Sequence, residues 1–117
     1  MVADFKAAVQ RGEIDMLVDD DGGVVGFIHH YHRSDHHFIE NVAIDPAYRG
    51  KGHGRRLLRH AEEQSRRSGC AAIELYTNEK MTENLELYPR LGFHETGRRE
   101  ENGFNRVYFR KDIGLTG

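Results

Sequence analysis

The stretch "AYRGKGHGRRLL", residues 47–58, alternates three glycines with cationic side chains and becomes apolar at Leu57 and Leu58. Glycine lets the backbone approach a ligand closely, and the free N–H groups at the start of a helix attract anions. Residues 49–67 hold seven Lys and Arg against two Asp and Glu, although the whole chain has a net charge of −2. The stretch therefore predicts a local anion site at the beginning of a helix.

The segments on either side of this stretch predict alternating strands and helices. Strands are expected over residues 14–18, 24–31, 38–44, 71–76, 93–98 and 106–111, and helices over residues 3–11, 52–68 and 82–88. A strand, a helix and a strand follow one another from residue 38 to residue 76, so the two strands should pair in parallel. Turns around residues 20–23 and 102–103 indicate antiparallel hairpins. The prediction is an α/β (α+β) fold with a mixed, mostly antiparallel sheet, one parallel crossover and flanking helices.

Length and composition favour a single domain over residues 1–117. A chain of 117 residues can bury a core without disulfides or metals. Cys70 is its only cysteine, which excludes an intramolecular disulfide and favours a reducing compartment. No apolar run approaches the roughly 18 residues of a membrane span, and the N-terminus lacks a signal-like segment. We therefore expect a cytoplasmic protein with no membrane partner.

Two common phosphate-binding loops do not fit the glycine-rich stretch. A P-loop needs Ser or Thr after Gly-Lys, whereas Gly52 follows Lys51 here. A Rossmann fingerprint needs a third glycine where Arg55 stands, even though Glu74 lies at a suitable distance for its acidic residue.

Three pieces of the chain together resemble a known family. Arg49-x-x-Gly52-x-Gly54 resembles the (Gln/Arg)-x-x-Gly-x-(Gly/Ala) signature with which GNAT N-acetyltransferases bind the pyrophosphate of coenzyme A. The stretch "ENVAIDPAYRG", residues 40–50, resembles the strand and Asp-Pro exit before that signature. The stretch "NLELYPRLGF", residues 84–93, resembles the family's segment around its tyrosine. The resemblance spans residues 40–93 and implies transfer of an acetyl group from acetyl-CoA to a primary amine by direct attack.

The resemblance also implies roles for individual residues. Tyr88 would be the general acid for the CoA thiolate, because an unperturbed tyrosine is protonated at pH 7. Glu40 is the candidate base, since its strand would carry the acetyl group; an exposed glutamate paired with a cross-strand cation is the alternative. Tyr76 is a further candidate for the base. The implied cofactor-binding residues are Val42, Ala43 and Ile44 for the pantetheine, then Arg49, Gly50, Lys51, Gly52, His53, Gly54 and Arg55 for the pyrophosphate, and Asn84. The pantetheine pairing requires the strand over 38–44 to separate from the strand over 71–76.

The chain departs from the family pattern in three places. Met81 stands where the family often has an asparagine, and Asn84 or Asn78 could replace it. Pro89 disfavours helical geometry at Tyr88, so the helix is expected to end or kink there. By the resemblance, the chain is expected to lack the family's N-terminal strand and first helix. Either the chain starts internally, or a second subunit covers the edge strand at 14–18, which predicts a homodimer.

The stretch "HHYHRSDHH", residues 29–37, has five histidines in nine positions. His30 and His32 should share a strand face with His37 opposite them across the turn. These histidines have three possible interpretations: a zinc or nickel site, solvent-exposed residues of a hairpin, or a proton relay beside the acceptor groove. We expect no metal, because no cysteine or well-spaced carboxylate completes the ligand set.

Two other functions compete with the enzyme. One is a CoA-binding domain without catalytic activity. The other is a nucleic-acid-binding module that uses the basic helix over 55–67. No cluster of aromatic residues accompanies that helix, and the rest of the chain is acidic, so we expect no nucleic acid. The acceptor is expected to be a small-molecule or peptide amine.

Overall fold

The computed structural model of the protein describes residues 11–114. Its elements are β1 (Ile14–Val18), β2 (Val24–Arg33), β3 (His36–Ile44), the 3₁₀ turn η1 (Pro46–Tyr48), α2 (His53–Arg67), β4 (Ala72–Asn78), α3 (Thr82–Arg90), β5 (His94–Glu101) and β6 (Phe104–Asp112). The helix expected over residues 3–11 lies, apart from Arg11, outside the described residues.

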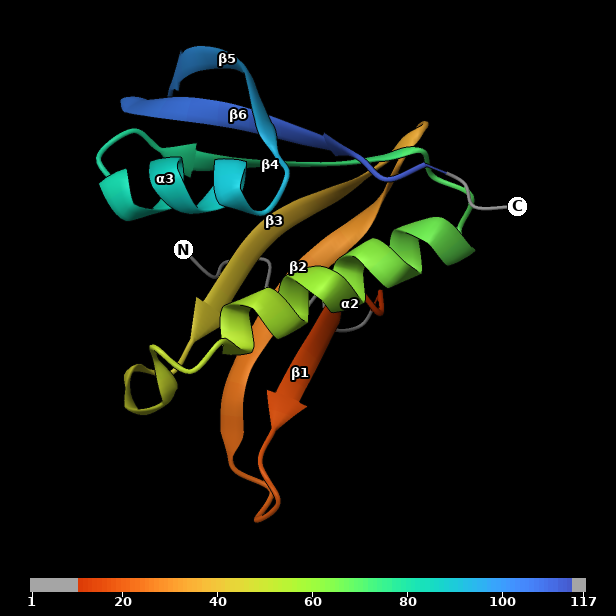
Figure 1. Cartoon of the computed structure of the whole chain (residues 1–117), viewed down its shortest axis with the longest axis vertical. Coiled ribbons are helices and arrows are strands. Elements are labelled where there is room, and N and C mark those ends of the chain that lie inside the picture. Colours follow the sequence, from red (N-terminus) through yellow and green to blue (C-terminus); the bar gives the residue numbers. More distant parts are fainter. Residues whose placement is uncertain (1–10, 115–117) are drawn as a thin grey trace.

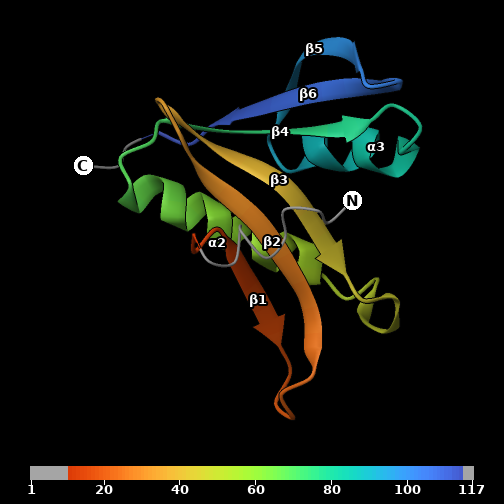
Figure 2. The ribbon, with the colours of Figure 1, turned by 180° about the vertical axis from the view of Figure 1, so that it is seen from behind.

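The six strands form one sheet in the order β1-β2-β3-β4-β6-β5. Only β3 and β4 pair in parallel, and the other neighbours pair antiparallel. In Figure 1, α2 runs across β2 and β3 while α3 lies beside β4; Figure 2, from behind, has the strands in front of α2. The mixed, mostly antiparallel sheet with one parallel crossover is confirmed.

The core lies between the sheet and α2. Leu57, Leu58 and Ala61 form the apolar stripe of α2 and belong to the same buried cluster as Ile39 and Leu75 of the sheet. Gly69, with a φ of 79°, lies just past the helix, and its N–H donates to the carbonyl of Arg66 while that of Cys70 donates to Ser65. This is a Schellman ending, as expected from Gly69.

The turns between strands are tighter than the sequence predicted, so the strands are longer. Asn102 and Gly103 both have positive φ, as a two-residue type I′ turn requires. β2 extends to Arg33 and β3 begins at His36. Most of the histidine-rich stretch is therefore strand rather than turn.

A β-bulge at Glu40 interrupts β3. His29 of β2 is opposite Asn41 and His30 is opposite Ile39, so Glu40 is the additional residue. The bulge changes which residues face the core: Ile39 is buried before it, whereas Val42 and Ile44 pack on the core after it. This change explains why hydrophobicity alternates only weakly along the strand.

The expectation that Pro89 ends α3 at Tyr88 is wrong. The helix continues through Pro89 to Arg90. Proline near the end costs one intrahelical hydrogen bond, and the ending compensates: Gly92, with a φ of 95°, donates its N–H to the carbonyl of Pro89, while Phe93 donates to Tyr88. Tyr88 thus lies in the last, capped turn of the helix.

Candidate functional site

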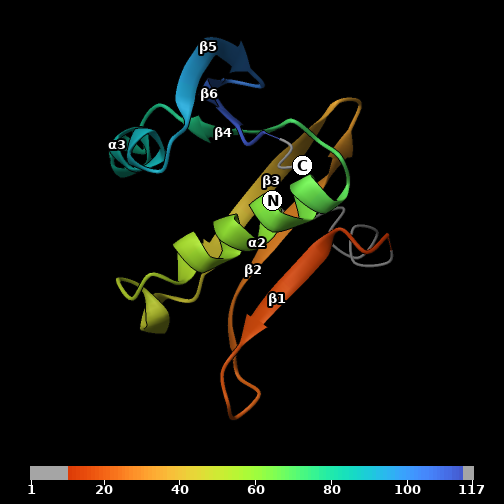
Figure 3. The ribbon, with the colours of Figure 1, turned by 45° about the vertical axis from the view of Figure 1, so that its right-hand side comes forward.

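The parallel strands β3 and β4 separate beyond their fourth pair. Ile39 opposite Leu75 is the last pair, although β3 continues to Ile44 and β4 to Asn78. Figures 1 and 3 show β3 running toward η1 while β4 runs toward α3. The backbone N–H of Asp45 donates a hydrogen bond to the carbonyl of Val25 on β2. By the alternation of a strand, the N–H groups of Val42 and Ile44 point away from β2, toward this opening. The separation that the sequence analysis required is confirmed.

The start of α2 lies next to this opening and presents unpaired backbone N–H groups. Gly50 and Gly52 have φ values of 79° and 83°, which only glycine adopts readily. Gly52 is the N-cap and provides no side chain, and the first turn of α2 contains no acidic residue. In the described chain, no backbone N–H group of residues 50–55 donates a hydrogen bond to a backbone carbonyl in a turn, loop or cap. The arrangement has the geometry and dipole of an anion site.

The cations around the helix start are not neutralised by the protein. In the part of the chain that the structure describes, no ion pair involves Arg49, Lys51, Arg55, Arg56 or Arg59. By contrast, farther along α2, Glu62 forms ion pairs with Arg66 of the same helix and with Lys111 of β6. The positive charge available to a ligand is therefore concentrated at the beginning of α2.

A groove between α2 and α3 extends this positive surface. Its volume is about 510 Å³, and its walls include Arg55 and Arg59 of α2, Arg90 of α3 and the apolar side chains of Leu58 and Phe93. Arg59 was expected to act only in the nucleic-acid alternative, as part of the basic helix over 55–67, and no expectation placed Arg59 and Arg90 in one groove. Their spacing along the chain could not reveal it, because the groove exists only once the two helices pack on the same core.

On the sheet face opposite α2, Glu40 accepts hydrogen bonds from two tyrosines. The hydroxyl of Tyr31 is 2.9 Å from Oε2 of Glu40, and that of Tyr76 is 3.3 Å from Oε1. Burial, followed by the hydrogen bond to Glu40, raises the pKa of Tyr31 to about 12, so both hydroxyls remain donors at neutral pH. Glu40 is thus held by tyrosines rather than by a cross-strand cation, and sequence reasoning missed Tyr31.

The tyrosines and Glu40 line a second groove of about 500 Å³. The guanidinium of Arg106 lies 4.3 Å from the ring centroid of Tyr76, and Tyr108 donates a hydrogen bond to Glu101 on the same face. Arginines already stack on three rings of this groove, Arg33 on Phe38, Arg106 on Tyr76 and Arg99 on Tyr108. The carboxylate of Glu40 at the bulge is therefore the feature of the groove that suits an amine.

Tyr88 lies on the other face of the sheet, on the side of α2. Its ring contacts Phe93 and Phe109 at centroid distances of 5.7 and 5.5 Å, and burial raises its pKa above the usual value. Asn84, one turn earlier, donates from its amide to Oγ1 of Thr77 at 3.1 Å, where β4 no longer pairs with β3. The face of α3 that carries Tyr88 therefore lies against the open part of β4.

The two other candidates near α3 have structural positions. Asn78 accepts the backbone N–H of Lys80 in the turn before α3. Met81 is the N-cap of α3, is exposed and forms no side-chain capping bond.

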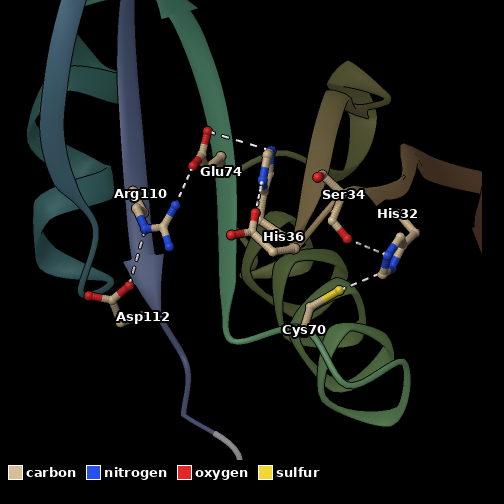
Figure 4. A network of polar contacts seen from close by, with 8 residues as sticks. His32, Ser34, His36, Cys70, Glu74, Arg110 and Asp112 are labelled. Atoms are coloured by element: carbon tan, nitrogen blue, oxygen red, sulfur yellow. Dashed lines mark hydrogen bonds and ion pairs between the residues drawn. The ribbon is translucent and has the colours of Figure 1, made fainter.

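The end of the sheet opposite the opening is closed by ion pairs (Figure 4). Glu74 of β4 lies 3.7 Å from Nε2 of His36 on β3 and 2.6 Å from the guanidinium of Arg110 on β6. Arg110 also pairs with Asp112, and His32 contacts Sγ of Cys70 at 3.1 Å. The two contacts of Glu74 connect β4 to β3 and to β6 at the end where the strands are paired, so the opening is confined to the other end.

The histidines of residues 29–37 contact several different partners. His29 pairs with Glu13, and His30 contacts His37 at 2.6 Å, as expected from their strand positions. His30 also lies 2.7 Å from a carboxylate oxygen of Asp15. Burial would raise the pKa of Asp15, but hydrogen bonds from His30 and His60 outweigh it and the pKa is lowered.

The mixed sheet, its opening and the glycine-rich start of α2 define an α/β domain with an anion site beside an open strand edge. The chain belongs to the GNAT family: residues 3–93 match the description "Acetyltransferase (GNAT) family". The match includes the helix start, the opening of the sheet and Tyr88.

Similar proteins agree with this assignment. Glucosamine 6-phosphate N-acetyltransferase of Trypanosoma brucei brucei is 44% identical over 55 residues, which are 47% of this chain and 35% of the relative. N-alpha-acetyltransferase RimI of Mycobacterium tuberculosis is 34% identical over 80 residues, or 65% of this chain and 49% of the relative. The chain thus spans about a third to a half of these curated relatives.

The crystal structure of the ribosomal-protein-S18-alanine N-acetyltransferase from Escherichia coli has a similar fold. Its TM-score is 0.83 at 24% identity, and the alignment covers 98% of this chain and 79% of that one. Among the described residues, no helix has both the length and the apolarity to cross a bilayer.

Proposed function

We propose that this protein is an N-acetyltransferase that moves the acetyl group of acetyl-CoA to a primary amine. The observation that carries the proposal is the opening between β3 and β4 beside a helix start with unpaired N–H groups and unneutralised cations. A long ligand with phosphates at one end and a strand-like amide chain at the other fits this combination. CoA has this construction.

The donor lies on the side of α2. Its pyrophosphate binds the N–H groups of residues 50–55, with Arg49, Lys51 and Arg55 around it. The pantetheine amides pair with the open edge of β3 at Val42 and Ile44, in the manner of an added strand. The groove between α2 and α3, with Arg59 and Arg90, takes up the remaining charge of the nucleotide.

The acceptor approaches from the opposite face, through the groove that contains Glu40. Its amine loses a proton to Glu40, directly or through water, and the nitrogen attacks the thioester carbonyl. Backbone N–H groups of β3 stabilise the oxyanion. The C–S bond then breaks, and Tyr88 protonates the leaving thiolate. The opening in the sheet lets donor and acceptor meet although they bind on different faces.

Replacing Glu40 by glutamine should lower kcat/KM for the amine by about 100-fold, because the amide keeps the shape of the side chain but cannot take up a proton. The affinity for CoA should not change, since Glu40 faces the acceptor. Steady-state kinetics and CoA calorimetry measure both quantities. Glu95→Gln is the matched control, because Glu95 is exposed and its ion-pair partner among the described residues is Arg98 alone. A rate for Glu40→Gln equal to that of the control would exclude Glu40 as the base.

An assay of thiol release tests the proposal as a whole. The protein is supplied with acetyl-CoA and a panel of small amines, amino acids and peptides with free N-termini. Thiol release that depends on the amine supports the enzyme. CoA binding without thiol release for any amine supports a CoA-binding domain that has no catalytic activity.

A further inference from the structure

Three side chains from three different elements meet at one point away from the opening of the sheet. Nε2 of His30 on β2 and Nε2 of His60 on α2 lie 2.7 and 2.8 Å from the same oxygen of Asp15 on β1. The three potential donor atoms all lie within 4.8 Å of one another. We propose that Asp15, His30 and His60 bind a divalent transition-metal ion, for which Zn²⁺ is the best match.

The donor set and its exposure suit such an ion. Two imidazole nitrogens and one carboxylate oxygen are ligands that zinc prefers, and three protein ligands leave a fourth tetrahedral position for water. His30 is only 6% exposed, whereas the side chains of His60 and Asp15 are 42% and 44% exposed. One ligand is thus fixed in the interior, and the other two border an open cavity of about 450 Å³ through which an ion can enter.

His37 provides the second layer of the site. Its Nε2 lies 2.6 Å from Nδ1 of His30, and it is 5% exposed. When Nε2 of His30 binds a metal, Nδ1 carries the proton and donates it to His37. A ligating histidine is usually oriented by such a partner on its other nitrogen. Both rings come from the paired strands β2 and β3, so the orientation of His30 is determined by the sheet.

The position of the site suggests what the ion does. β1 is an edge strand of the described sheet and pairs only with β2. Asp15 and His60 are 45 residues apart in sequence, so the unfolded chain does not hold the ligands together. An ion that binds only the folded state stabilises it by mass action and ties the edge strand to β2 and α2.

Zinc titration of untagged, metal-free protein tests this assignment. Calorimetry gives the stoichiometry, and thermal unfolding with and without Zn²⁺ gives an independent readout. We expect one zinc per chain and a rise of the unfolding midpoint with zinc concentration. His60→Asn should weaken binding by more than the roughly 10- to 100-fold loss typical of an outer-layer residue, and so should Asp15→Asn. Because His60 and Asp15 are partly exposed, these variants should fold.

Two controls separate this site from other histidines. His94→Asn changes an exposed histidine on β5, and His32→Asn changes a histidine that lines the same cavity but contacts Cys70. Both should bind zinc like the wild type. The assignment is overturned by the lack of a stoichiometric zinc site, by His60→Asn and Asp15→Asn that bind like the wild type, or by loss of binding in His32→Asn alone. The acetyltransfer assay does not enter this test.

Discussion

Gly54→Glu should stabilise the domain and lower its affinity for CoA at least 100-fold. Gly54 lies in the first turn of α2, where an added Cβ has no protein atom within 4 Å and the backbone φ is not positive. Replacing glycine in a helix by a better helix former, together with a negative charge at the helix start, adds about 1 kcal/mol of stability. The thermal midpoint should therefore rise by about 4 °C.

The same change opposes the ligand because the carboxylate lies where the pyrophosphate binds. Losing charge-assisted contacts of about 3 kcal/mol corresponds to a factor of about 100 in the dissociation constant. Calorimetry with CoA and thermal unfolding measure the two effects on one sample. Gly54→Ala is the control: it should also gain stability, but it should still bind CoA. If Gly54→Glu binds CoA as Gly54→Ala does, the start of α2 is not the phosphate site.

Tyr88→Phe should lower kcat by about 100-fold or more while the affinity for CoA stays the same. The hydroxyl is the only group lost, and the ring contacts with Phe93 and Phe109 that hold the side chain remain. Burial raises the pKa of Tyr88, so the residue is protonated throughout the range in which the acceptor amine becomes a free base. The wild-type rate should therefore rise with pH from neutrality toward about pH 10, without a falling limb in that range.

Pre-steady-state measurement of thiol release at saturating acetyl-CoA tests the role of Tyr88. Tyr48→Phe is the control for the loss of a tyrosine hydroxyl, because that hydroxyl is bonded to Asp19 and the ring that packs beside His53 is kept. An unchanged kcat in Tyr88→Phe would show that another group or water protonates the thiolate.

Local patterns predicted much of the fold. The Asn102-Gly103 turn, the C-terminal glycine of α2 and the Phe38–Tyr76 crossover follow from short-range chemistry, and all three are present. The failed expectation at Tyr88 has a different origin. The effect of Pro89 on the helix depends on Gly92 and Phe93, which compensate for it beyond the point where the sequence rule was applied.

The candidate site also has parts that the sequence predicts and parts that it does not. The helix start could be predicted because Gly50, Gly52 and Gly54 are neighbours in sequence. The pairing of Tyr31 and Tyr76 with Glu40 could not, because it depends on the bulge that turns Glu40 toward them. The expectation of no metal rested on a missing carboxylate. Asp15 and His60 approach His30 only when β1 and α2 pack on β2.

Calorimetric titration of the intact protein with CoA and with pantetheine, which lacks the diphosphate and the nucleotide, shows whether the start of α2 binds the diphosphate of the coenzyme. We expect saturable binding of one CoA per chain and much weaker binding of pantetheine. Equal affinity for the two, or no heat with CoA, would contradict it.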